Sequence, residues 1–228
     1  MSMKPTFLTL VSIFFLISCN NNENTSSETD AQQETSQEVP VSQEKKNKKI
    51  IFLGNSLTAA YGLDPDQGFP ALIQAKIDSL GLDYEVINAG LSGETTAGGA
   101  ERVDWILQQP VDIFILELGG NDGLRGIEPE ASYKNLKSIV DKVQAKYPDA
   151  QIILAGMQAP PNMGPDFTQK FRDMYPQLAR EENLALIPFL LENVGGIPAL
   201  NLQDGIHPNV EGQKIVAENV WEVLEPML

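Results

Sequence analysis

The sequence predicts an α/β protein: a single-domain, three-layer α/β/α sandwich with a mostly parallel, five-stranded sheet. Short apolar runs alternate with longer stretches of helical spacing over residues 49–228, which is typical of parallel strands joined by helices. The runs are apolar almost throughout, as expected of strands that helices cover on both faces. At about 180 residues, this segment is long enough to bury the core of one domain.

Five short runs are predicted to form the strands. The first, residues 49–53, reads Lys-Ile-Ile-Phe-Leu and ends at Gly54. Its short length, its β-branched and aromatic residues and the glycine that follows favour a strand. The other four expected strands repeat this pattern and span residues 84–88, 113–118, 152–155 and 184–188.

Longer stretches between these runs space their apolar residues at intervals of three and four, which predicts helices. They span residues 69–80, 95–109, 130–146 and 166–182, and another, residues 211–224, follows the last strand. In such a sheet, functional groups gather beyond the carboxyl ends of the strands. Polar residues that follow a strand are therefore the first candidates for a site.

The first 48 residues are expected to lie outside this domain. Residues 1–18 have the form of a signal peptide, because Lys4 precedes an apolar run over residues 7–17 that is too short to cross a bilayer. Leu-Ile-Ser-Cys, ending at Cys19, resembles the lipobox of bacterial lipoproteins, which implies cleavage before Cys19 and lipidation of that residue. An ordinary signal peptide with a cysteine at its cleavage site is the alternative.

Residues 19–48 are predicted to be the lipidated cysteine and a disordered tether. Residues 20–48 are almost entirely polar and cannot bury a core. A random coil of this length would separate its ends by roughly 30 Å. The expected location is the bacterial cell envelope, with the protein held on a membrane by its lipid and facing the periplasm or the exterior.

Composition argues against several classes of function. The 16 Lys and Arg against 31 Asp and Glu leave a net charge of -15, which disfavours a nucleic-acid partner. One cysteine and one histidine cannot build a His/Cys zinc site without several carboxylates. We therefore expect no metal and no cofactor, and any imidazole chemistry must use His207. The oligomeric state is left open.

Several polar residues are predicted to meet at one edge of the sheet. Ser56 follows the first strand, Gly93 the second and Asn121 the third, while Asp204 and His207 lie just before the last helix. A nucleophilic hydroxyl needs an oriented imidazole as its base, and a developing oxyanion needs hydrogen-bond donors aimed at it. These residues supply a hydroxyl, an imidazole with a carboxylate nearby, and candidate hydrogen-bond donors.

Four blocks that contain these residues resemble those of one hydrolase family. They are GNSLTAAYG at 54–62, NAGLSGET at 88–95, GGND at 119–122 and DGIHPN at 204–209. In this order they resemble the SGNH (GDSL) hydrolases and cover nearly all of residues 49–228. The stretch LELGGNDGLRG at 116–126 is similar to the bacterial thioesterase I, lysophospholipase L1 or arylesterase subgroup. No G-x-S-x-G elbow of the α/β-hydrolase fold is present.

The resemblance implies a flavodoxin-like sandwich and a serine esterase. Ser56 would attack the acyl carbonyl, His207 would accept and return the proton, and Asp204 would orient the imidazole. The backbone N–H groups of Ser56 and Gly93 and the side-chain amide of Asn121 would form the oxyanion hole.

Three nearby residues are open to a second interpretation. Asn55 stands where the family motif has aspartate, which leaves the fold of the turn intact but removes a charge beside the nucleophile. Ser92 is a competing nucleophile, although it precedes the glycine that the family pattern assigns to the oxyanion hole. Glu117, a carboxylate in an apolar strand, is either a second acid or, as we favour, a hydrogen-bonded structural group.

The substrate is expected to be a small-molecule or lipid ester. Residues after the third and fourth strands would line an acyl site or are ordinary packing residues, and Arg125 would meet a head group or a surface acid; the candidates are Leu124, Arg125, Ile127, Met157 and Pro160. The resemblance favours lysophospholipids, acyl thioesters and small esters. A carbohydrate O-acetylesterase and a tethered, non-catalytic binding module are the alternatives.

Overall fold

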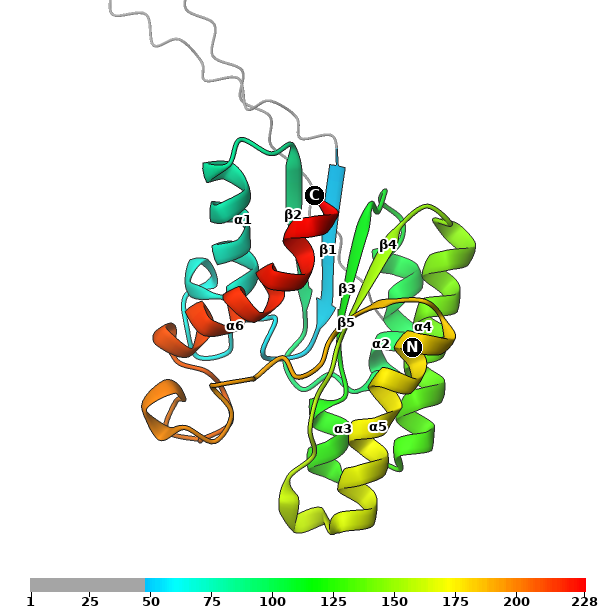
Figure 1. Cartoon of the computed structure of the whole chain (residues 1–228), viewed down its shortest axis with the longest axis vertical. Coiled ribbons are helices and arrows are strands. Elements are labelled where there is room, and N and C mark those ends of the chain that lie inside the picture. The colour runs from blue at the N-terminus through cyan, green and yellow to red at the C-terminus, as the bar shows by residue number, and fades with distance from the viewer. Residues whose placement is uncertain (1–47) are drawn as a thin grey trace, which may run out of the picture. The chain divides into compact units, whose positions relative to one another are not determined.

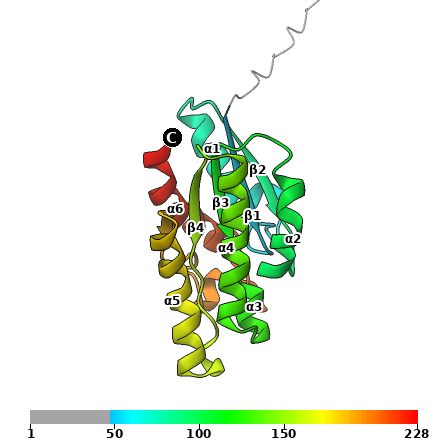
Figure 2. The ribbon, with the colours of Figure 1, turned by 90° about the vertical axis from the view of Figure 1, so that its right-hand side faces the viewer.

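The computed structural model describes residues 48–228, which form a sheet between two layers of helices (Figures 1 and 2). The expectations for the signal peptide, for Cys19 and for the tether up to residue 47 lie outside these residues. The first strand begins at Lys48, one residue before the predicted start.

All five predicted strands are present, and every pairing between them is parallel. Their order across the sheet is β2-β1-β3-β4-β5, so the chain crosses from one side of β1 to the other after β2. The strands are β1 (Lys48–Gly54), β2 (Tyr84–Gly90), β3 (Ile113–Glu117), β4 (Gln151–Ala155) and β5 (Ala185–Ile187). The predicted α/β fold is confirmed.

Helices cover both faces of the sheet. On one face α1 (Phe69–Ser79) packs against α6 (Val210–Leu224), and on the other α4 (Pro129–Lys146) packs between α2 (Thr96–Ile106) and α5 (Pro165–Glu181) (Figure 2). The five predicted helices are these, with ends that differ from the prediction by at most three residues. Thr95, for example, is the N-cap of α2 and accepts a hydrogen bond from Gly98 N, so it precedes the helix that it was expected to begin.

Short helical segments in the connections were not predicted. A sixth helix, α3 (Gly120–Arg125), follows β3 directly, and 3-10 turns are found at η1 (Pro65–Gln67), η2 (Pro161–Met163), η3 (Pro198–Leu200) and η4 (Glu225–Met227). Elements of three to six residues are too short to show hydrophobic periodicity, and α3 contains two glycines. The sequence pattern therefore gives no signal for them.

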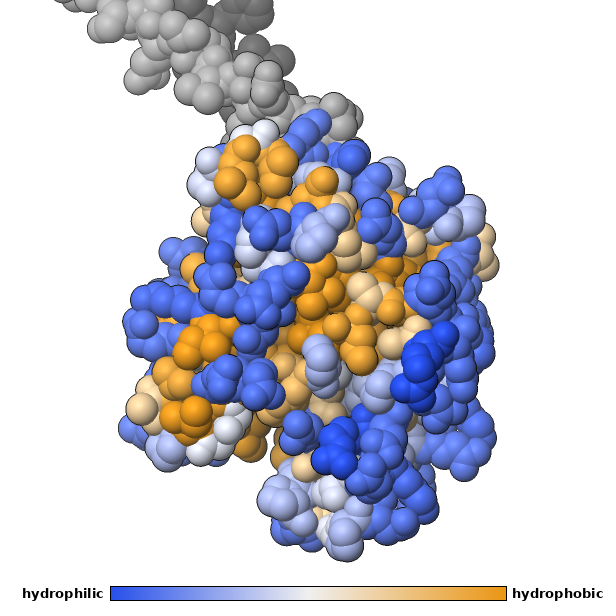
Figure 3. Space-filling model, viewed as in Figure 1, coloured by the Kyte–Doolittle hydropathy of each residue, from blue (hydrophilic) through white to orange (hydrophobic). Residues whose placement is uncertain are grey.

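The core lies on both sides of the central strands. Residues 50–53 of β1 are fully buried, and β3 is buried along its whole length, which explains why these strands read as continuous apolar runs. Figure 3 shows hydrophilic residues over the outer helices, whereas hydrophobic residues reach the surface between α6 and α5.

The register of the sheet aligns the carboxyl ends of its first three strands. Gly54, the last residue of β1, pairs with Gly90 of β2 and with Glu117 of β3. The loops that leave these strands carry Ser56 and Gly93 and the short helix that contains Asn121. Sheet register thus gathers these segments at one edge, as the sequence predicted.

Candidate active site

Ser56, His207 and Asp204 form a continuous hydrogen-bonded chain. His207 Nε2 lies 2.8 Å from Ser56 Oγ, and His207 Nδ1 lies 2.7 Å from Asp204 Oδ2. An ionised carboxylate only accepts hydrogen bonds, so Nδ1 carries the hydrogen and Nε2 is the acceptor that faces the serine hydroxyl. The tertiary structure brings together three side chains whose sequence positions span most of the domain.

A tight turn holds the aspartate beneath the imidazole. Asp204 Oδ1 accepts from the backbone N–H groups of Ile206, at 2.9 Å, and His207, at 3.0 Å. The hydrogen bond from the His207 side chain and these two backbone donors lower the pKa of Asp204 to about 2. Asp204 is therefore ionised at any pH at which the protein would work, as a carboxylate that orients an imidazole must be.

Gly93 lies in the loop after β2, in a conformation that few other residues adopt. Its φ of 84° lies in the left-handed region, where an L side chain is strained. Its carbonyl oxygen accepts from Arg125 Nη2 at 3.1 Å, which ties this loop to the end of α3. Arg125, expected to meet a head group or a surface acid, instead donates to a backbone carbonyl of this loop.

Asn121 is in the first turn of α3, and its side chain also contacts this loop. Asn121 Nδ2 donates to the backbone oxygen of Glu94 at 3.0 Å. An amide NH₂ carries two hydrogens, so the second is available to a ligand while the first fixes the orientation of the group. Gly93 and Asn121 are therefore linked through Glu94, the residue after Gly93.

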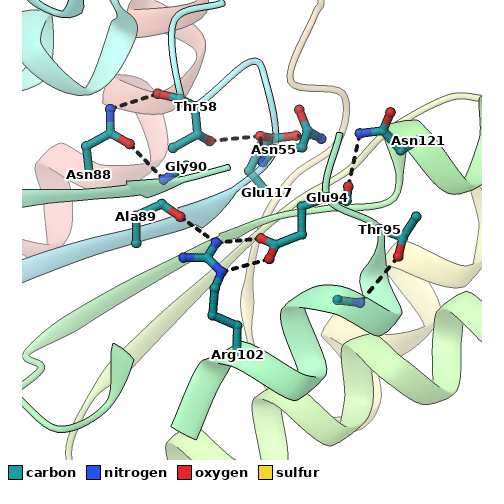
Figure 4. Close-up of polar contacts among 11 residues, drawn as sticks. Asn55, Thr58, Asn88, Ala89, Gly90, Glu94, Thr95, Arg102, Glu117 and Asn121 are labelled. Carbon is teal, nitrogen blue, oxygen red and sulfur yellow. Dashed lines mark hydrogen bonds and ion pairs between the residues drawn. The ribbon is translucent and has the colours of Figure 1, made fainter. Parts of the chain in front are cut away.

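A partly buried ion pair supports the same loop (Figure 4). Arg102 of α2 donates through Nε to Glu94 Oε1 at 2.7 Å and through Nη2 to Glu94 Oε2, and Nη2 also donates to the backbone oxygen of Ala89 at 2.7 Å. The Glu94 side chain is only 3% exposed. Sequence analysis did not identify this pair, because nothing in its spacing marks the two residues as partners.

The Ser56 turn rests on Glu117, the last residue of β3. Glu117 is fully buried and accepts hydrogen bonds from Asn55 and Thr58, as expected of a hydrogen-bonded group. The turn itself is intact with asparagine at position 55: Leu57 N donates to Asn55 Oδ1 at 2.9 Å.

Tyr61 contacts the imidazole and was missed by the sequence analysis. Its ring centroid lies 4.5 Å from that of His207, with the rings tilted by 38°, and half of the residue is exposed. The block 54–62 that contains Ser56 also contains Tyr61, and this was the available signal. The competing nucleophile, Ser92, is exposed in the loop before Gly93, whereas the hydroxyl that meets His207 is that of Ser56.

The predicted substrate residues lie in two different environments. Leu124 and Arg125 are exposed on α3, and Ile127 and Pro160 are half-buried. Met157 is a buried member of the core, and a Cβ on Gly120 would lie 3.9 Å from its Cγ. A surface hollow of about 450 Å³ lies beside the end of β2 instead, and its lining includes Ile87, Arg102, Trp105 and Ile106 but none of the predicted substrate residues.

No group of three or more His, Cys, Asp or Glu within residues 48–228 is placed to hold a metal ion. Over the same residues, no helix is long and apolar enough to cross a membrane.

Comparison with known proteins identifies the family. The model of the GDSL-like lipase/acylhydrolase family matches residues 52–215. The chain belongs to this family. It is accordingly a serine acylhydrolase, and an ester is its substrate.

Relatives extend over nearly the whole described region. Esterase TesA from Pseudomonas aeruginosa is 41% identical over 191 residues, which cover 83% of this chain and 94% of that protein. Thioesterase 1/protease 1/lysophospholipase L1 from Escherichia coli is 36% identical over 180 residues, 78% of this chain and 84% of the other. A crystal structure of TesA superposes with a TM-score of 0.76 at 42% identity and covers 79% of this chain and 100% of that one.

Proposed function

We propose that Ser56 is the nucleophile of this acylhydrolase, with His207 as its general base and Asp204 as the group that orients the imidazole. The observation that carries this proposal is the pair of short contacts on either side of the His207 ring, 2.8 Å to Ser56 Oγ and 2.7 Å to Asp204 Oδ2. A nucleophile, a base and an orienting carboxylate within hydrogen-bond reach are what the attack of a neutral hydroxyl on an acyl carbonyl requires.

The reaction proceeds through an acyl-enzyme. Ser56 Oγ bonds to the acyl carbon while His207 Nε2 takes the hydroxyl proton, and the intermediate then expels the alcohol or thiol, which receives that proton. Water attacks the acyl-enzyme in the same way, again with His207 as base, and the carboxylic acid leaves as the Ser56 hydroxyl is restored. Asp204 stays ionised throughout and stabilises the imidazolium.

The oxyanion would be received by donors from three segments. We assign these to the backbone N–H groups of Ser56 and Gly93 and to the second hydrogen on Asn121 Nδ2. The contact between Asn121 and the Glu94 carbonyl supports this assignment, because a preorganised donor stabilises the transition state more than one that must reorient. Removing one such donor typically costs about 2.7 to 4 kcal/mol.

Labelling by a fluorophosphonate tests the role of Ser56. The reagent should modify the wild-type protein once, at Ser56, with loss of esterase activity, and it should not modify Ser56→Ala or His207→Ala. Ser92→Ala is the matched control, since it removes an exposed hydroxyl from a neighbouring loop and should still be labelled. Folded wild-type protein that takes no label would instead support a tethered binding module without turnover.

An apolar acyl group is the substrate feature that the site favours. The segments that carry the site residues expose large hydrophobic side chains: Tyr61, against the His207 ring, is 50% exposed, Ile206 44%, Leu91 51%, and Leu124, on α3 with Asn121, 47%. Large apolar groups exposed together around a polar centre are typical of a ligand-binding rim. The names of the relatives above, esterase and thioesterase/lysophospholipase, agree with such substrates.

A panel of esters separates this substrate class from the alternative. Lysophosphatidylcholine, an acyl thioester and aryl esters of rising chain length should all be hydrolysed by the wild-type protein and not by Ser56→Ala. Acetylated sugars should be poor substrates. The reverse order of rates would favour a carbohydrate O-acetylesterase.

We also propose that the mature chain is a lipoprotein of the bacterial cell envelope, anchored through Cys19 and facing the periplasm or exterior. The Leu-Ile-Ser-Cys motif after an apolar run supports this, as does the polar stretch that separates it from the domain. Several acyl chains at about 0.8 kcal/mol per buried methylene would hold the protein firmly on a bilayer. Cys19→Ala should lose membrane association and remain active in the soluble fraction; unchanged partitioning would reject the anchor.

A further inference from the structure

Glu117 faces the Ser56 turn with both of its carboxylate oxygens. Oε1 accepts from Asn55 Nδ2 at 2.8 Å, while Oε2 accepts from Asn55 N at 3.1 Å and from Thr58 Oγ1 at 2.8 Å (Figure 4). These donors stand on both sides of Ser56 in the chain, and Glu117 has no exposed surface. One buried side chain from β3 therefore holds the turn that presents the nucleophile.

The turn is also pressed closely against this carboxylate. A Cβ added to Gly54 would lie 2.0 Å from Thr58 Oγ1 and 2.6 Å from Glu117 Oε2, distances that no side chain tolerates. Only glycine allows β1 to end so near the carboxylate. The Gly54 backbone, before Ser56, and the Thr58 hydroxyl, after it, thus both pack against the Glu117 carboxylate.

The side-chain amide of Asn55 lies between the Glu117 carboxylate and the backbone of the Ser56 turn. Its Nδ2 donates to Glu117, and its Oδ1 accepts from Leu57 N at 2.9 Å and lies 3.4 Å from Ser56 Oγ. The orientation of the amide is determined, because the backbone N–H of Leu57 can only donate and therefore faces Oδ1, which leaves Nδ2 directed at Glu117. Asn55 is therefore held by Glu117 through its NH₂ group and places its own oxygen, a hydrogen-bond acceptor, beside the Ser56 hydroxyl.

We propose that Glu117 and Asn55 are a matched positioning pair, a buried carboxyl group and its amide donor, that holds Ser56 in line with His207. This inference rests on the proposed role of Ser56 as the nucleophile. Neither side chain is required to exchange a proton with the substrate. What the pair supplies is the geometry of the turn, since a displacement of about 1 Å at a reacting atom costs on the order of 100-fold in rate.

The charge of Glu117 determines how an aspartate at position 55 would behave. Burial raises the pKa of Glu117 to about 7, against the opposing effect of the hydrogen bonds from Thr58 and Asn55, so the ionised form predominates above neutral pH. An aspartate at position 55 would place a second carboxylate against the first. Two buried carboxylates in contact retain one proton between them until the pH is well above the usual range for acids.

Other titratable groups on neighbouring elements are engaged elsewhere. The Tyr175 hydroxyl of α5 donates to the Leu118 carbonyl at 3.0 Å, and Asp122 of α3 accepts from Thr96 Oγ1 at 2.6 Å. His207 approaches the turn from the side of Ser56. The contacts of Glu117 described above come from the turn itself.

Exchanging the two functional groups tests the pair. Glu117→Gln places two amides face to face, and Asn55→Asp places two acids face to face, whereas Asn55→Asp with Glu117→Gln restores one donor and one acceptor with the total charge of the wild type. Each variant is assayed for kcat and KM on a short aryl ester between pH 6 and 9.5 and for the rate of fluorophosphonate labelling. Glu222→Gln, an exposed carboxylate on α6, is the control for loss of charge.

Glu117→Gln should lower kcat and the labelling rate by about 10- to 100-fold with little change in KM, because the turn loses its template. Asn55→Asp should approach wild-type activity near pH 6, where the pair shares a proton, and lose about 10-fold relative to wild type by pH 9 as that proton leaves. The exchanged double variant should recover to within about 3-fold of wild type, without that extra loss.

Two outcomes would overturn the proposal that Glu117 and Asn55 position Ser56. They are a double variant no more active than the weaker single variant, and an Asn55→Asp profile that matches the wild type up to pH 9.5. If Glu117→Gln fails to fold, Thr58→Val removes one donor to the same oxygen and should lower kcat by about 3- to 10-fold; full activity in Thr58→Val would also count against the pair. A wild-type protein that takes no label, by contrast, would reject the role of Ser56 itself.

Discussion

Replacing Arg102 with methionine should loosen the loop that carries Gly93. The change leaves the Glu94 carboxylate, 3% exposed, without the guanidinium that holds it. Removing one partner of a buried pair costs about 3 to 5 kcal/mol. The Arg102 side chain is 22% exposed, so water can reach the vacated site, and we expect a loss at the lower end, about 3 kcal/mol.

For a domain of this size, such a loss corresponds to a fall of roughly 6 to 12 °C in Tm. Because Asn121 donates to the Glu94 carbonyl, kcat should also fall, by about 10-fold, as the amide loses its fixed position. Thermal unfolding followed by circular dichroism measures the first effect and ester hydrolysis the second. Arg172→Met, at an exposed arginine of α5, is the matched control.

A double-mutant cycle then separates the ion pair from general packing. Adding Glu94→Gln to Arg102→Met removes the unpaired charge, so the double variant should be more stable than Arg102→Met alone. A Tm for Arg102→Met within about 2 °C of wild type, or a double variant less stable than both single variants, would refute the reasoning.

Three further changes test other parts of the site. Gly93→Ala should cost about 1 to 2 kcal/mol of stability through its positive φ alone, since an added Cβ would meet nothing nearer than Arg125 Nη2 at 3.9 Å; equal denaturation midpoints for the two proteins would contradict this. Leu124→Ser should raise KM by about 5-fold for a long-chain ester but not for an acetyl ester, and an equal effect on both would remove Leu124 from the acyl site. Because burial raises the pKa of Glu117 from 4.5 to about 7, the folded protein keeps a proton that the unfolded chain has lost within this window. The free energy of unfolding should therefore fall as pH rises from 4.5 to 7, and a denaturant series should show a weaker fall in Glu117→Gln.

Local patterns in the sequence were enough to predict the sheet and its main helices. The apolar run over residues 50–53 and the helical spacing over α4 are properties of neighbouring residues. A strand buried on both faces is apolar throughout, and a helix buried on one face repeats its apolar residues every three or four positions, so both patterns can be seen within a short stretch of sequence. The parallel direction of the strands was predicted from the alternation of strand-like and helical segments. The segments that were not predicted, such as α3, are too short to show a hydrophobic periodicity.

The residues of the proposed triad could be identified from the sequence because they stand in recognisable blocks after strands. Their roles remain proposals, but the structure brings Ser56, His207 and Asp204 within hydrogen-bond distance. The supporting contacts had no such signal. Glu117 lies 62 residues from Asn55, and Tyr61 meets His207 across the length of the domain.

What the sequence determined by itself is therefore the order of the elements and the chemical groups placed at their ends. Only the tertiary structure decided which group faces which, because this depends on the register that aligns Gly54 with Gly90 and Glu117. Parallel strands are joined through helices, so their register is set by packing over long distances in the chain rather than by a local turn. The contacts of Glu117 with Asn55 and of Asn121 with the Glu94 carbonyl exist because that packing brings their segments together.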